Sequence, residues 1–215
     1  MEVYLSEEER VDALKKWVKE NYRSAIVGVA LGLAVMGGWN AWQTNKRHKA
    51  EEASALYQNL LKAVEAKQTD PAKQLSQRLV DNYQGTLYAT YGALFQAKLK
   101  VEAGDLAGAK QTLADLLNAT KDDAFKHVIR IRLANVLLAL GEAKEALGLI
   151  EPLPRDKVGE FESVYEVLKG DAYVAVDRVD DARKAYEKAK QLGDASPGLQ
   201  LKLDNLAVDV AKPVS

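Results

Sequence analysis

The chain has 215 residues, of which 47% are hydrophobic and 28% charged, so it can bury a core and lacks the composition of a disordered protein. Its 30 Lys and Arg residues nearly balance its 31 Asp and Glu residues, which leaves no net basic field for holding nucleic acid. It contains no cysteine, which excludes thiol nucleophiles, disulfide bonds and cysteine-ligated metals and suits an oxidising compartment such as a periplasm.

Residues 1–23 predict a short amphipathic segment at a membrane surface. Ser6 and the glutamates that follow it, Glu7 to Glu9, have the form of a capping box, which starts a helix by satisfying its first backbone N–H groups. Val11, Leu14 and Val18 then recur at helical spacing and place an apolar stripe on one face.

Residues 24–45 predict a single transmembrane helix. This run carries no charge and lies between Arg23 and Lys46. As a helix it extends about 33 Å, enough for a hydrocarbon core of about 30 Å. Aromatic residues that favour the two membrane interfaces flank the run: Trp17, Tyr22, Trp39 and Trp42.

A buried core helix and a cleaved signal peptide are the two other interpretations of this run. Water-soluble cores rarely need an all-round apolar run of this length. A signal peptide has a shorter apolar region that ends in a small-x-small cleavage site. Here the long polar segment 1–23 precedes the run, and the run ends in Trp39-Asn40-Ala41-Trp42. The pattern therefore favours an uncleaved signal anchor.

The basic residues on the two flanks indicate an orientation. The N-terminal flank has five, Arg10, Lys15, Lys16, Lys19 and Arg23, and the other flank has three, Lys46, Arg47 and Lys49. Because basic flanks favour the cytoplasmic side, we expect the N-terminus inside and residues 46–215 outside.

Small residues recur at four-residue spacing within the span, at Gly28 and Gly32 and again at Ala34 and Gly38. Either row allows another helix to approach closely, so we name these four as helix-packing positions. Glycine and alanine are also common in membrane helices without such a role, and both interpretations stay open.

Residues 46–215 predict an all-α, tetratricopeptide-like repeat domain, because apolar residues recur at helical spacing and no run alternates like a strand. Four alanines recur at nearly constant spacing: Ala72, Ala109, Ala146 and Ala182. A second small or apolar set precedes them, with turn signals in between: Leu60, Ala97, Ala134 and Gly170. The period, roughly 36 residues, is typical of paired-helix repeats. An unrelated helical bundle is the alternative.

A final helix from about Gly198 to Val210 should cap the open end of the solenoid. The first helix of each unit should line a concave groove, and the repeat register places these residues on it: Tyr57, Leu61, Val64, Tyr91, Leu94, Val101, Val128, Ile131, Leu138, Val164, Val167 and Val174. Such an apolar lining suits a partner or client protein. Alternatively, these residues form core between the helices, or the last helix fills the groove.

The sequence shows no catalytic constellation. Its only histidines, His48 and His127, have no plausible triad partner nearby, and two scattered histidines without cysteine argue against a transition-metal site. Carboxylate pairs such as Asp122-Asp123 lie at helix starts, where capping explains them. We therefore expect no enzymatic activity, cofactor, metal or small-molecule substrate.

A series of segments, taken in order along the whole chain, carries a family resemblance: Glu2-Val3-Tyr4, the span from Val27 to Trp39 with Trp42, Tyr91-Gly92-Ala93-Leu94, Ile131-Arg132-Leu133-Ala134 and Lys202-Leu203-Asp204-Asn205-Leu206. With them the chain resembles the YfgM family, the ancillary subunit of the bacterial SecYEG translocon. The resemblance implies a single-pass inner-membrane protein with a cytoplasmic N-terminus and a periplasmic repeat domain. It also implies SecYEG and PpiD, a membrane-anchored periplasmic chaperone of the prolyl-isomerase type, as partners besides the lipid bilayer, and a role in helping secreted chains. It brings no catalytic residues.

A scaffold for an envelope assembly complex, such as the division or cell-wall machinery, is the competing function, because such complexes also use membrane-tethered repeats. The sequence alone does not separate a translocon-associated adaptor from a scaffold. A membrane-bound enzyme has the least support.

Overall fold

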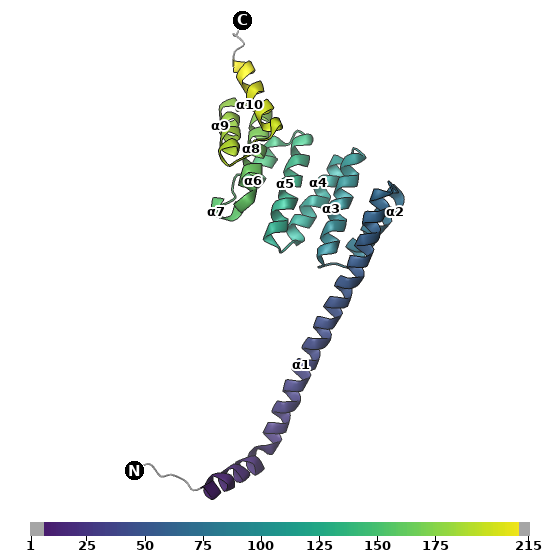
Figure 1. The fold of residues 1–215 in the computed structure, drawn as a ribbon, viewed down its shortest axis with the longest axis vertical. Helices are drawn as coiled ribbons and strands as arrows, with labels where there is room; N and C mark the ends of the chain where they lie inside the picture. The colour runs from purple at the N-terminus through teal and green to yellow at the C-terminus, as the bar shows by residue number, and fades with distance from the viewer. Residues whose placement is uncertain (1–6, 211–215) are drawn as a thin grey trace, which may run out of the picture. The chain divides into compact units, whose positions relative to one another are not determined.

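The computed structural model describes residues 7–210, and this part of the chain is helical without a strand (Figure 1). Ser6 of the predicted capping box and the segment Glu2-Val3-Tyr4 lie outside it. The elements are α1 (Glu7–Glu65), α2 (Thr69–Asn82), α3 (Leu87–Glu102), α4 (Leu106–Ala119), α5 (Asp123–Ala139), α6 (Ala143–Ile150), α7 (Arg155–Val158), the 3₁₀ turn η1 (Gly159–Phe161), α8 (Glu162–Ala175), α9 (Val179–Gln191) and α10 (Pro197–Val210). They form two compact units, residues 1–52 and 53–215.

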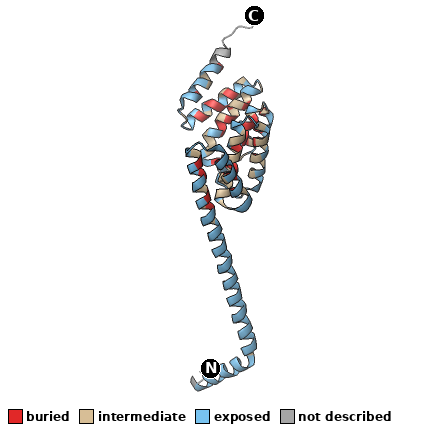
Figure 2. Ribbon diagram, turned by 90° about the vertical axis from the view of Figure 1, so that its right-hand side faces the viewer, coloured by how far each residue is buried: buried red, intermediate tan, exposed pale blue. Residues whose placement is uncertain are grey.

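The first unit contains the N-terminal part of α1, and its side chains are almost all exposed (Figure 2). Among the described residues, the segment that begins at Ile26 is the one helix long and apolar enough to cross a membrane. Leu33, Met36 and Trp39 are 64 to 70% exposed. A continuous exposed surface of large apolar side chains is characteristic of contact with lipid or with another protein rather than with water.

The second unit is a row of helix pairs. The C-terminal part of α1 packs on α2, and α3/α4, α5/α6 and α8/α9 follow in order, each helix contacting the next (Figure 1). The predicted alanines Ala72, Ala109, Ala146 and Ala182 are at most 2% exposed, and the preceding set Leu60, Ala97, Ala134 and Gly170 is buried opposite them. The predicted tetratricopeptide-like architecture is therefore confirmed.

Local sequence fixes where several of these helices begin and end. The side chains of Thr86, Asp105 and Asp122 accept hydrogen bonds from backbone N–H groups in the first turns of α3, α4 and α5. Asp122 thus acts as a helix cap, as its position at a helix start predicts. Gly104 and Gly141 adopt φ of 78°, which lets the chain leave α3 and α5 in a tight turn.

A close approach of α2 and α3 explains the small residue Ser76, which stands where these repeats usually have a large apolar side chain. Ser76 is fully buried, and its hydroxyl donates to the carbonyl oxygen of Lys73 at 2.8 Å. A Cβ atom at Gly92 of α3 would lie 3.0 Å from the Ser76 carbonyl oxygen. A larger residue at either position would separate the two helices.

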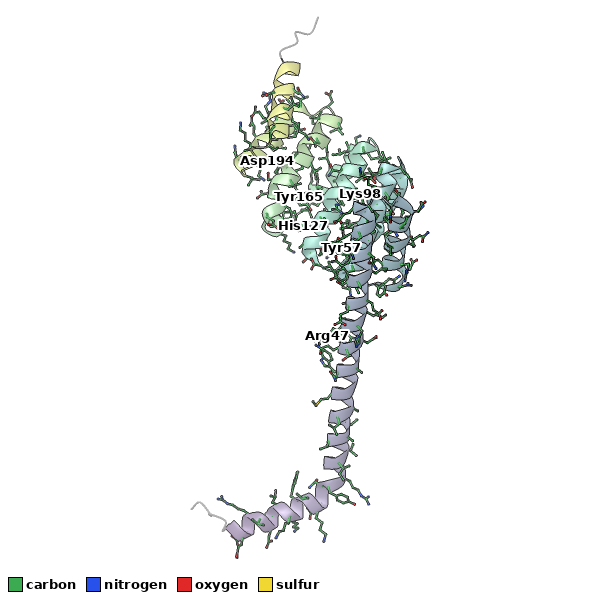
Figure 3. All side chains as sticks on the ribbon, turned by 45° about the vertical axis from the view of Figure 1, so that its right-hand side comes forward. Arg47, Tyr57, Lys98, His127, Tyr165 and Asp194 are labelled. Atoms are coloured by element: carbon green, nitrogen blue, oxygen red, sulfur yellow. The ribbon has the colours of Figure 1, made fainter. Side chains whose placement is uncertain are left out.

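A short insertion, α7 and η1, separates the third pair from the fourth and was not predicted. His127 of α5 holds it. Its Nε2 donates to the carbonyl oxygen of Lys157 at 3.1 Å, and its Nδ1 then accepts from the Tyr165 hydroxyl at 2.8 Å. The ring also stacks on Phe161, with 5.2 Å between centroids. His127 and Tyr165 lie together in Figure 3, and their contacts give this histidine a packing role.

Helix α10 covers the end of the last pair, close to the predicted bounds. Leu199 and Leu206 are buried against α9. Lys202 forms an ion pair with Asp171 of α8, and Asp171 also accepts a hydrogen bond from the Tyr186 hydroxyl of α9 at 2.7 Å. This polar contact ties three helices together at the edge of the apolar cluster.

Candidate protein-binding groove

A cavity of about 930 Å³ opens along the first helices of the first three pairs of the repeat domain. Its walls come from the C-terminal part of α1, from α3 and from α5, and α4 contributes part of its floor. The lining is mostly apolar: Tyr57, Leu60, Leu61, Val64, Tyr91, Leu94, Phe95, Ala97, Lys98, Val101, Glu102, Leu106, Leu113, Phe125, Val128, Arg132, Asn135, Val136 and Ala139. We call this cavity the groove.

An aromatic row crosses the groove. Tyr57 of α1 stacks on Tyr91 of α3 with 5.1 Å between ring centroids, and Tyr91 meets Phe125 of α5 edge to face at 5.7 Å. Such offset and edge-to-face pairs hold rings in defined positions. Burial, and then the proximity of Tyr91, raise the pKa of Tyr57. The Tyr57 hydroxyl therefore stays neutral at physiological pH, and it adds no charge to the row.

The groove leaves apolar surface open to solvent. Leu61 and Val101 are 37% and 41% exposed, whereas Leu94 and Leu113 beneath them are buried. A buried floor below exposed apolar walls is the arrangement of a preformed binding site, because the walls gain burial only when something occupies the space.

Polar side chains on α3 and α5 complete the lining. Lys98 and Glu102 form an ion pair along α3 at 3.6 Å. Asn135 of α5 donates to the carbonyl oxygen of Ile131 one turn earlier at 2.9 Å, and Arg132 lies beside it on the same helix. Tyr57 and Lys98 are labelled in Figure 3. A few polar groups around an apolar surface can orient a bound segment.

The structure places the predicted groove residues in two groups. The first group lines the groove: Tyr57, Leu61, Val64, Tyr91, Leu94, Val101 and Val128. The second group does not: Ile131, Leu138, Val164, Val167 and Val174. Ile131 and Leu138 pack against the core between α5 and α8, and Val167 packs against the α9–α10 cluster. Val164 and Val174 are exposed, at 42% and 44%, but outside the cavity.

Ile131 and Leu138 lie outside the groove, unlike the prediction from the repeat register, and the difference has a physical cause. The unpredicted insertion brings Val158 and Phe161 into the cluster that these two residues join. The inward face of α5 is therefore covered at that point, and the groove ends there. Helix α10 packs against α8 and α9 and contributes none of the described residues that line the groove.

Phe125 also lines the groove, although it was not among the predicted groove residues. A signal for it exists, since the steps from Tyr57 to Tyr91 and from Tyr91 to Phe125 are equal in length. Each step is the period of a tetratricopeptide repeat, so one aromatic ring per unit falls at the same position. Lys98 and Arg132 are separated by the same step, as are Val101 and Asn135, so the repeat period brings these polar residues to the groove as well.

The predicted helix-packing positions of the first unit are all open. A Cβ atom added at Gly28, Gly32 or Gly38 would meet nothing within 4 Å, and Ala34 is exposed. Close packing of another helix on these residues stays a prediction. Within residues 7–210, apart from the few undescribed side chains, no group of three or more His, Asp or Glu side chains is placed to hold a metal ion.

Comparisons with known proteins give one consistent family. The family model described as "Tetratricopeptide repeat-like domain" matches residues 15–208. The relatives described as "Ancillary SecYEG translocon subunit" include three that this chain matches over nearly its whole length. The Haemophilus influenzae protein is 31% identical and the Aggregatibacter actinomycetemcomitans protein 32%, each over 94% of this chain and 98% of the relative. The Escherichia coli K12 protein is 31% identical over 97% of this chain and 100% of the relative. No solved structure matches the chain.

Proposed function

Because the chain belongs to the tetratricopeptide repeat-like family of ancillary SecYEG translocon subunits, we propose that it associates with the SecYEG translocon in the bacterial inner membrane and acts by binding proteins rather than by catalysis. The observation that carries this proposal is the open, aromatic-lined groove. It lies in a chain that also has an exposed apolar helix of membrane-spanning length.

The anchor is residues 24–45, and the five basic residues before it, against three after it, favour a cytoplasmic N-terminus. The repeat domain is then periplasmic, on the side where secreted chains leave the channel. Here a binding groove has access to segments that are not yet folded.

The groove binds apolar segments of secreted chains, beside the membrane-anchored periplasmic chaperone PpiD. Leu61 and Val101 supply apolar area, and burial of such area stabilises a complex by about 25 cal/mol per Å² with little dependence on sequence. The aromatic row supplies rigid contact area. Both properties suit transient binding of many different chains.

A full-length chain with a C-terminal affinity tag tests topology and association together. In spheroplasts, added protease should remove the tag, because residues 46–215 face the periplasm. From untreated membranes solubilised in a mild detergent, the tagged chain should recover SecY, SecE and SecG.

A cytoplasmic protein, intact after the protease treatment, provides the control for membrane integrity. If the tag stays intact in spheroplasts in which the protease degrades the periplasmic domain of a known membrane protein, the proposed orientation is wrong. Recovery of the chain without any translocon subunit, in detergent that keeps SecY bound to SecE, would contradict the association.

A further inference from the structure

Four residues at the end of the apolar span form one stripe along α1. Trp39, Trp42, Lys46 and Lys49 follow each other at spacings of three, four and three residues, which place them on a single face of a helix. All four are exposed. We call them the interfacial stripe.

Side-chain contacts order this stripe. The rings of Trp39 and Trp42 lie 5.2 Å apart, and the Lys46 ammonium lies 4.4 Å from the centroid of the Trp42 ring. An ammonium over an indole face is held by cation–π attraction, which is strongest with tryptophan. The contact places the charge directly beside the ring instead of leaving it free on a flexible stem.

The position of Lys46 along the helix matches the depth of lipid phosphate. Lys46 is the first charged residue after Arg23. At a helical rise of 1.5 Å per residue, the two positions are about 34 Å apart, slightly more than a hydrocarbon core of about 30 Å. Indole rings favour the boundary of that core. The two ammonium groups of the stripe then lie just beyond it, among the headgroups.

We propose that the interfacial stripe binds the headgroup of an anionic phospholipid, whose phosphate oxygens accept hydrogen bonds from Lys46 and Lys49 while the two indole rings pack against the glycerol and upper acyl chain. The inference rests on the proposed membrane span. A zwitterionic headgroup fits less well, because its own ammonium group opposes the two lysines. Glu51 lies five residues from Lys46, on another side of α1, and contacts His48 at 3.6 Å.

Arg47 adds to the attraction without joining the stripe. It is the neighbour of Lys46, and because an α-helix turns by about 100° per residue it projects to another side of α1. Each basic residue close to the bilayer surface favours anionic lipid about fivefold. Removal of both stripe lysines should therefore remove most of the selectivity while one positive charge remains.

Tryptophan fluorescence reports the lipids next to the stripe. The full-length chain with Trp17→Phe, in which Trp39 and Trp42 are the remaining tryptophans, is reconstituted into phosphatidylcholine vesicles. The vesicles contain equal fractions of either brominated phosphatidylglycerol or brominated phosphatidylethanolamine, whose bromine atoms quench nearby indoles. We expect stronger quenching by the phosphatidylglycerol. In the Lys46→Gln/Lys49→Gln variant that preference should fall about tenfold or more.

The matched control is Lys15→Gln/Lys19→Gln, which removes the same charge from the other flank and should keep the preference. Equal quenching by the two brominated lipids, or an unchanged preference in the Lys46→Gln/Lys49→Gln variant, would show that the stripe anchors the helix without selecting lipids and would overturn the proposal. If neither lipid quenches the indoles, residues 24–45 do not span the membrane, and both the proposed span and the proposed lipid site are wrong.

Discussion

Replacement of Gly170 by alanine should destabilise the repeat domain, although alanine is the better helix former. A Cβ atom at this position would lie 2.1 Å from Cε1 and 2.3 Å from Cδ1 of Tyr186. The Tyr186 ring is 2% exposed, and its hydroxyl donates to Asp171, so the ring has no room to withdraw. Overpacking of this kind costs about 1–3 kcal/mol, and we expect the midpoint of thermal unfolding to fall by about 2–4 °C per kcal/mol.

Gly148 of α6 provides a control, because the same substitution there should stabilise the domain instead of destabilising it. A Cβ atom there would meet nothing within 4 Å, so Gly148→Ala should gain about 0.5–1 kcal/mol from helix propensity alone. Circular dichroism of the full chain in detergent compares the two variants. If Gly170→Ala melts at or above the temperature of Gly148→Ala, the close packing of α8 on α9 around this glycine is wrong.

Glutamate substitutions at the exposed apolar walls should strongly weaken groove binding without unfolding the domain. Leu61 and Val101 are exposed enough to accept a carboxylate, and glutamate is a good helix former. Each change removes apolar area that a bound segment would cover. We therefore expect a loss of about 1.5–3 kcal/mol, which is roughly ten- to hundredfold in affinity. The affinity is measured as the fluorescence anisotropy of a labelled apolar peptide from a secretory precursor, added to the full chain in lipid nanodiscs.

Val174→Glu is the matched control for Val101→Glu. The two valines are 44% and 41% exposed, and both lie on the first helix of a repeat, but Val174 is outside the groove. Its variant should bind the peptide like the unchanged chain. Equal weakening by Val101→Glu and Val174→Glu would place the binding surface elsewhere or show that added charge alone explains the loss.

The repeat period predicts the fold well because it reflects a requirement of every unit. Wherever two helices of a pair cross closely, a small side chain is needed, and Ala109, Ala146 and Ala182 meet that need at regular spacing. An uncharged apolar run likewise predicts the span at residues 24–45, and hydrophobic periodicity predicts the final helix. These features depend on local sequence and on one repeated contact.

Features that depend on one particular neighbour were not predictable in this way. The register places Ile131 on the inward face of α5, but the insertion that covers that face has no counterpart in the other units. No sequence pattern around His127 predicts its hydrogen bonds to Tyr165 and Lys157, because these residues lie far away along the chain on other elements. The sequence therefore indicates which side of the solenoid carries the groove, but the folded chain decides where the groove ends.

Site-specific photo-crosslinking in living cells identifies directly what occupies the groove. A photoreactive amino acid replaces Leu61, Val101 or, as the control, Val174 in the full chain. We expect positions 61 and 101 to yield adducts with secreted chains in transit and with translocon-associated proteins, and position 174 to yield neither. Identical adducts from all three positions, or adducts at positions 61 and 101 that contain neither class of protein, would contradict the proposed function of the groove.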